Sequence, residues 1–316
     1  METIKKKQWP ALEIWRRFVK NPLALVGLGI FIFLIALGVF APLISPATEQ
    51  FPGYNLQDWS VVRQSPSADF WFGTDQFGRD VFARIAYGAR VSLTVGLIVV
   101  SIAMTVGVTL GAIAGYYGGV ADNIIMRIID IILAIPSILL AISVAAALGP
   151  GLTNVMIAVG INAIPAYARQ MRAQVVSYKE QEFVEAARSI GASNVRIVLR
   201  HILPNSLAPI IVEASMGMAF AILAAAGLSF IGVGLQPPTP EWGAMLSDGR
   251  QFILVEGNWH LTVFPGLAIA LVIFSLNLIG DGLRDALDPK LRSGGFSKRR
   301  FLKIVKARTA VEERGM

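Results

Sequence analysis

The sequence holds few residues whose types and spacing suit catalysis or metal binding. Its two histidines, His201 and His260, lie far apart and do not form the H-E-x-x-H pattern of a zinc protease. No G-x-x-x-x-G-K-[ST] segment is present to bind phosphates, and the chain has no cysteine for thiolate chemistry, disulfides or metal binding. We therefore expect no catalytic residue, no metal site and no cofactor in this chain. Both histidines are interpreted as interfacial residues rather than ligands.

One polar segment is a candidate for binding instead, because long apolar stretches flank it. It reads "EFVEAARSIGASNVRIVLRHILPN" and begins at Glu182. Glu182 and Glu185 place negative charge in the first turn of an expected helix, where the helix dipole favours it. Ala186 and Ala187 have small side chains that project little from the surface of this helix. Gly191 is suited to end it. We predict a helix–turn–helix with a small-residue corner that points away from the membrane.

The second half of this segment predicts an amphipathic helix. Ser193 or Asn194 can cap its start, and Pro204 is expected to end it where the next apolar stretch begins. Arg196 and Arg200 lie away from an apolar stripe with helical spacing. This stripe is expected to pack on the protein's own helices, and it consists of Val195, Val198, Leu199, Ile202 and Leu203.

The composition of the whole chain is that of a membrane protein. Of 316 residues, 54% are hydrophobic and 16% are charged, whereas a soluble domain has about 25% charged residues. A membrane-spanning helix needs about 20 apolar residues. Six stretches meet this length, and the first is too long for the apolar part of a signal peptide. The predicted spans are 22–44, 90–115, 124–148, 152–171, 206–232 and 261–283.

The positive charges orient these spans. With the N-terminus inside, 23 of the 28 Lys and Arg residues fall on the inner side, as the positive-inside rule requires. The net charge of +7 is thereby explained without nucleic-acid binding. The resulting layout has both termini in the cytoplasm and a transmembrane region at 22–283. Its other parts are a cytoplasmic N-terminal segment at 1–21, an outer loop at 45–89, an inner loop at 172–205 and a basic cytoplasmic tail at 284–316.

Glycine and proline residues within the spans predict close packing and bends. Gly107, Gly111 and Gly115 form two overlapping G-x-x-x-G steps, which let helix backbones approach closely. Pro136 and Pro165 each remove a backbone donor within a span, so each is expected to bend it. Such bends can serve gating or be purely structural.

Three acidic residues lie near the predicted inner ends of spans. Asp130 and Asp281 each have an arginine three residues away in sequence, Arg127 and Arg284, which allows a helical ion pair. Membrane acids also serve as ion or proton relays, and both interpretations remain open here. Glu213 has no such local partner and no assigned role.

Two loop segments are expected on the outer side. Residues 76–87 show helical spacing of apolar side chains, with Thr74 or Asp75 as the cap of an interfacial helix that leads into the second span. The prolines at 237, 238 and 240 predict a stiff loop, which Trp242 is expected to anchor at the membrane interface.

The polar segment resembles the EAA loop of ABC-importer permeases in Glu185, Ala186, Ala187, Gly191, Leu203 and Pro204. In that family the loop forms a coupling helix that docks into a groove on the ATPase subunit. One departure is His201, which stands where the general motif has an isoleucine, with Ile202 one position later.

Three further blocks are similar to the C-type membrane subunits of dipeptide, oligopeptide and nickel permeases. They are "FGTDQFGRDVFARIAYGARVSL" from Phe72, "PPTPEWGAMLSDG" from Pro237 and "GDGLRDALDPKLR" from Gly280. The blocks occur in the family's order. The basic tail beyond Arg292 extends past the usual end of these subunits, and either anionic lipid binding or disorder fits it.

The resemblance implies an all-α integral membrane protein with six transmembrane helices, similar to a type I ABC-importer permease. It implies a role in ATP-driven uptake of di- or oligopeptides or a related small solute across a prokaryotic inner membrane. The implied partners are a homologous second permease, two cytoplasmic ATPases that bind ATP and magnesium, and an extracytoplasmic solute-binding protein. Glu185, Ala186, Ala187 and Gly191 would form the docking site. A self-sufficient secondary transporter or channel is the alternative.

Overall fold

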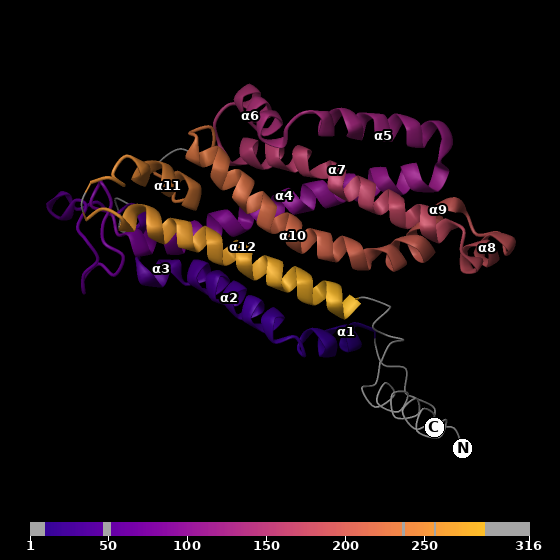
Figure 1. Ribbon diagram of the computed structural model, residues 1–316, viewed down its shortest axis with the longest axis horizontal. Helices are drawn as coiled ribbons and strands as arrows, with labels where there is room; N and C mark the ends of the chain where they lie inside the picture. The colour runs from indigo at the N-terminus through magenta and orange to yellow at the C-terminus, as the bar shows by residue number, and fades with distance from the viewer. Residues whose placement is uncertain (1–9, 47–51, 236–237, 256, 288–316) are drawn as a thin grey trace, which may run out of the picture.

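The computed structural model describes residues 10–46, 52–235, 238–255 and 257–287 as a bundle of helices (Figure 1). Within these residues the only β pairing is an isolated bridge between Thr74 and Asp80. The first nine residues and most of the basic tail lie outside this description, as does Pro237. The first elements are α1 (Pro10–Phe18), α2 (Pro22–Val39), α3 (Ala41–Ile44), η1 (Gly53–Asn55), η2 (Trp59–Val61), α4 (Val81–Tyr117), α5 (Gly119–Ala134) and α6 (Ser137–Leu148). They are followed by α7 (Leu152–Lys179), α8 (Glu182–Ser189), α9 (Asn194–Ile197), η3 (Val198–Ile202), α10 (Leu203–Phe230), α11 (Trp242–Arg250) and α12 (His260–Leu287).

The long helices lie side by side and define two ends of the molecule. In Figure 1, α3 and α11 lie at one end, which we call the loop end, and α8 and α9 lie at the other, which we call the corner end. The most extensive helix pairing is that of α4 with α7, and α12 packs on both α2 and α10. Many side chains of these helices are large, apolar and exposed, as in helices that face lipid.

Four helical segments of the described chain are long and apolar enough to cross a membrane. They are α2, α4, α12 and the stretch that joins α9, η3 and α10, and the bent pair of α5 and α6 makes a fifth if it is one span. The predicted fourth span, 152–171, lies within α7, which carries Arg169 and Arg172 and is not among these segments.

The predicted third span is broken into two helices. The axes of α5 and α6 are bent by 93° at the break, and Pro136 lies between them. The bend predicted within this span at Pro136 is therefore present. Pro165 does not break its helix, because α7 continues through it.

Close contact between α4 and α7 depends on three glycines of α4. A methyl group on Gly107 would lie 2.7 Å from Cβ of Tyr167, and one on Gly115 would lie 2.9 Å from the carbonyl oxygen of Arg172. Gly111 faces the backbone of Ala168 in the same way. Real Cβ atoms do not approach other atoms this closely, so the G-x-x-x-G steps serve helix packing.

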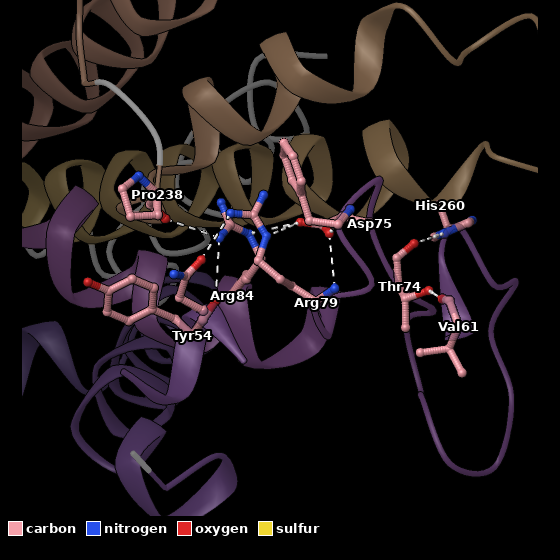
Figure 2. Close-up of polar contacts among 10 residues, drawn as sticks. Tyr54, Val61, Thr74, Asp75, Arg79, Arg84, Pro238 and His260 are labelled. Atoms are coloured by element: carbon pink, nitrogen blue, oxygen red, sulfur yellow. Dashed lines mark hydrogen bonds and ion pairs between the residues drawn. The ribbon is translucent and has the colours of Figure 1, made fainter. Parts of the chain in front are cut away.

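At the loop end, buried charges connect segments that are distant in sequence (Figure 2). Nε of Arg79 donates a hydrogen bond of 2.7 Å to the carboxylate of Asp75, and Nε of Arg84 lies 3.5 Å from the same carboxylate. Nη1 of Arg84 also donates to the carbonyl oxygens of Pro238, at 3.1 Å, and Tyr54, at 3.4 Å. All three ionised side chains are buried. The cluster thus connects the loop before α4, α4 itself and the segment before α11.

This arrangement corrects the interfacial helix expected at 76–87, because residues 81–87 form the first turns of α4 itself. The helix begins at Val81, and its cap is Asp80, whose carboxylate accepts from the backbone N–H of Phe82 at 2.8 Å. Neither Thr74 nor Asp75 caps it. Asp75 is committed to the arginines, and the Thr74 hydroxyl donates to the carbonyl of Val61.

Two expected interfacial residues are instead buried at the loop end. The ring nitrogens of His260 lie 3.1 Å from the carbonyl oxygens of Gly257 and Thr74, and its side chain is fully covered. Trp242 is also fully buried, and its Nε1 donates to the carbonyl oxygen of Ile85 at 3.1 Å. Both expectations of an interfacial position are wrong, because the loop end folds over these side chains.

Candidate functional site

The candidate site is the helix α8, which lies at the corner end of the bundle (Figure 1). Its first turn carries Glu182 and Glu185, and its last turn carries Arg188, so both signs of charge match the helix dipole. A helix of only eight residues is not stable in water by itself, because short isolated helices are marginal. Tertiary packing and the way α8 ends must therefore fix it.

Gly191 ends α8 in a Schellman motif. It has a φ of +82°, which is a left-handed conformation that favours glycine. The N–H of Gly191 donates to the carbonyl of Arg188 at 3.0 Å, and the N–H of Ala192 donates to the carbonyl of Ala187 at 3.1 Å. Ala192 and Ala187 belong to one apolar cluster, which completes the motif.

The four predicted site residues do not share one face. Glu185, Ala186 and Gly191 are exposed, and no atom lies within 4 Å of a methyl group placed on Gly191. Ala187 is only 4% exposed and packs with Val184. The expectation that both alanines lie at the surface is therefore wrong for Ala187, which supports the corner from inside.

Two exposed apolar side chains, one on α8 and one on the residue that follows its last turn, were not singled out by sequence reasoning. Phe183 is 38% exposed and Ile190 is 86% exposed. Together with Ala186 they have the spacing i, i+3 and i+7, so they form one stripe beside Glu182 and Glu185. The signal was available in the sequence as a second helical stripe, next to the buried one that contains Val184 and Ala187. We call Phe183, Ala186 and Ile190 the corner stripe.

The segment after Gly191 starts as predicted but does not end as predicted. The Ser193 hydroxyl accepts from the N–H of Arg196, which caps α9. The hydroxyl of Tyr116, near the end of α4, donates to the side chain of Asn194 at 2.8 Å. Pro204 does not end the helix but lies in the first turn of α10, directly after the turn at 198–202, although it has no N–H to donate. The helical stretch from Asn194 therefore continues into α10.

A π-turn at η3 joins these helices and changes which side chains are buried. The N–H of Leu203 donates to the carbonyl of Val198, five residues earlier. Ile197 and Ile202 are both fully buried, although positions five apart on a straight α-helix would point about 140° apart. His201, where the family motif has isoleucine, lies within this turn.

The predicted apolar stripe of this segment is only partly buried. Val195 is 61% exposed and Leu199 is 58% exposed, so the expectation that they pack on the bundle is wrong. They border a groove of about 230 Å³ between this segment and α4. The π-turn accounts for the difference. It lies in the middle of the predicted stripe and rotates the helix there, so the five positions no longer share one face.

The acidic residues of the spans also find other neighbours than expected. Asp130 pairs with Arg169 of α7 at 2.6 Å and not with Arg127. No ion pair joins Asp281 to Arg284 in the part of the chain that the structure describes. The carbonyl oxygen of Glu213 accepts from the hydroxyl of Tyr167 at 3.4 Å. Among the described residues, no cluster of three or more His, Asp or Glu side chains is placed to hold a metal ion.

Comparison with known proteins identifies the family. The model of the binding-protein-dependent transport system inner membrane component matches residues 107–293. The model of the N-terminal TM domain of oligopeptide transport permease C matches residues 10–66. The polar segment that begins at Glu182 and all of α7 thus lie in the first matched region.

Relatives of similar length support the same assignment. The dipeptide transport system permease protein DppC of Alkalihalophilus pseudofirmus is 52% identical over 290 residues, covering 90% of this chain and 93% of that protein. The glutathione transport system permease protein GsiD of Shigella flexneri is 49% identical over 283 residues, covering 90% and 91%.

Among solved structures, an inward-facing conformation of the MetNI methionine ABC transporter has the same fold. Its chain superposes with a TM-score of 0.53 at 18% identity, covering 64% of this chain and 94% of that chain. The chain described here therefore belongs to the family of binding-protein-dependent transport system inner membrane components, the multi-pass helical permeases of ABC importers.

Proposed function

We propose that this chain is a permease subunit that imports short peptides, of the dipeptide or glutathione type, and receives force from partner ATPases at α8. The relatives that it matches over nine-tenths of its length are named for dipeptide and glutathione transport, which supports this solute class. The single observation that carries the docking role is the corner stripe, which presents exposed apolar side chains on a helix with a fixed end.

The corner stripe is suited to insertion into a groove on another protein. Ile190 is 86% exposed and Phe183 is 38% exposed, and Ala186 between them has too small a side chain to obstruct a close approach. Apolar anchors that fill pockets carry most of the binding free energy in protein interfaces. Glu182 and Glu185 flank the stripe, so the groove that receives it should carry basic side chains.

Two rigid connections would carry movement of α8 into the bundle. Val184 and Ala187 pack in one cluster with Ile197, Met171 and Val175, so α8 is connected to α7. Through Gly191 the chain then enters the helical stretch from Asn194 to Phe230, which crosses the bundle without a break. A displacement of α8 would thereby shift α10 as well as α7.

The proposed assembly contains a second, homologous permease, two cytoplasmic ATPases and an extracytoplasmic solute-binding protein. ATP and magnesium would bind to the ATPases, and this chain would hydrolyse nothing. Six crossings of a prokaryotic inner membrane would leave both termini and the corner end in the cytoplasm. This orientation is supported by the excess of Lys and Arg in the segments at that end.

Vesicles that contain the assembled transporter test the proposal. Uptake of a labelled dipeptide should require ATP on the side of the membrane that carries the ATPases. It should also require the binding protein on the opposite side. The permease alone should show no ATP hydrolysis. Robust uptake by this chain as the sole protein, driven by an ion gradient, would contradict the proposal and support a secondary transporter.

A further inference from the structure

An exposed ion pair joins two helices of the bundle, α5 and α7. Asp130 of α5 and Arg169 of α7 are joined at 2.6 Å, and their side chains are 52% and 55% exposed. Figure 1 shows α5 running alongside α7, so the pair bridges two neighbouring helices. Ionised side chains within a membrane face protein or water because contact with lipid is costly.

The pair lies well inside the bundle and not at its end. Asp130 is eleven residues after the start of α5 at Gly119, which corresponds to about 16 Å along the helix axis. Next to it, Ile129 is fully buried and packs with Leu110 of α4 and Ile164 of α7. The pair is thus level with the interior of these two helices.

The surface of α5 is divided into three faces. At about 100° per residue, Ile125 and Ile129 point to one side, where they pack on α4 and α7. A second face is exposed and apolar, and it consists of Ile124, Ile128 and Ile131. The third face is exposed and polar, and it consists of Asn123, Arg127 and Asp130. A helix with only protein and lipid around it would have no such third face.

The polar face continues on α7 towards the break between α5 and α6. Arg169 and Asn162 are seven residues apart on α7, so they lie on one side of it. The side chain of Asn162 donates a hydrogen bond of 3.3 Å to the carbonyl oxygen of Ser137, the first residue of α6. We call Asn123, Arg127, Asp130, Arg169 and Asn162 the polar track.

We propose that the polar track lines the water-filled path along which the solute crosses the membrane. The inference rests on the proposed transport function, because a path for a polar solute requires such a surface. Broken membrane helices are tolerated where their free backbone groups meet protein or a water-filled cavity, and the break at Pro136 adjoins the track. The isoleucine face of α5 is left to contact lipid or a partner subunit.

The absence of cysteine makes the proposal testable in the assembled transporter. Asn123→Cys, Arg127→Cys and Asp130→Cys should each react with a charged, membrane-impermeant thiol reagent in inside-out or right-side-out vesicles. Ile128→Cys is the matched control, since Ile128 is 53% exposed on the apolar face of the same helix, and it should stay unlabelled until the membrane is dissolved. Asn123→Cys leaves the ion pair intact, so it remains informative if Asp130→Cys fails to assemble.

Two outcomes decide the matter. Labelling of the track positions without labelling of Ile128→Cys supports the proposal. Track positions as unreactive as Ile128→Cys in both vesicle orientations would overturn it, because the track would then face lipid or a dry interface. The result does not depend on which solute is carried, so failure of dipeptide uptake together with labelling would reject the solute class alone.

Discussion

The N–H of Ala192 donates a hydrogen bond of 3.1 Å to the carbonyl oxygen of Ala187, across the turn that ends α8. This bond and the one from Gly191 to Arg188 fix the direction in which the chain leaves the corner. The corner stripe is therefore held on a defined end and not on a flexible loop. The proposed docking function depends on this geometry.

Substitution of Gly191 tests the turn separately from its surroundings. Gly191→Ala forces a side chain into a left-handed conformation, at a cost of about 1–2 kcal/mol, although no atom is near enough to clash with it. We expect weaker co-purification of the ATPases with normal amounts of permease in the membrane. Gly191→Asn should be milder, because asparagine tolerates this conformation. Equal effects of the two variants would exclude backbone strain as the cause.

The two alanines of the motif should differ in what they affect. Ala187→Leu adds volume to a buried position beside Val184 and should lower the free energy of unfolding by about 1–3 kcal/mol. Ala186→Leu changes an exposed position and should leave thermal stability in detergent unchanged while it weakens ATPase association. Thermal unfolding and co-purification measured on both variants check this. A stable Ala187→Leu permease would show that the inner side of α8 tolerates extra volume.

The buried charges at the loop end should be far more sensitive than surface charges. Asp75→Asn leaves Arg79 and Arg84 buried without their carboxylate, and the loss of one member of a buried pair costs about 3–5 kcal/mol. We expect a large drop in membrane abundance and in the thermal midpoint. The matched control is Asp69→Asn, because Asp69 is exposed on the same segment. Similar losses for both variants would contradict a role for the cluster in stability.

Membrane orientation can be read from single cysteines. Ser65 lies in the segment before α4 at the loop end, and Ser177 lies near the end of α7 at the corner end, and both are exposed. With both termini inside, Ser65→Cys should react with an impermeant thiol reagent added to intact cells or spheroplasts. Ser177→Cys should react only after lysis. The opposite pattern would reverse the proposed topology and place the corner stripe outside the cell.

The sequence predicts some structural features of this molecule better than others. Hydropathy indicated where the long helices lie, and proline chemistry indicated the break at Pro136. The glycine steps on α4 pointed to close packing, and the structure shows α7 as the partner. These features depend on local composition and spacing, which a single sequence displays directly.

The features that sequence reasoning missed depend on distant contacts or on helix geometry. Trp242 and His260 were expected at the interface, because nothing in their local sequence shows that the loop end folds over them. Asp130 had a cation three residues away, yet Arg169 on another helix is its partner. The π-turn changed the buried face of residues 194–203, and a periodicity argument assumes that no such turn is present.

The central claim is that the corner stripe docks on an ATPase. Its most direct test is cross-linking from Ile190→Cys, the only cysteine in the resulting permease, in membranes that contain the whole transporter. We predict a product that contains an ATPase with a phosphate-binding G-x-x-x-x-G-K-[ST] loop, identified by mass spectrometry. Leu254→Cys should give no such product, because Leu254 is 97% exposed at the loop end. If Ile190→Cys formed no ATPase product although its thiol was reactive, the docking role of α8 would be contradicted.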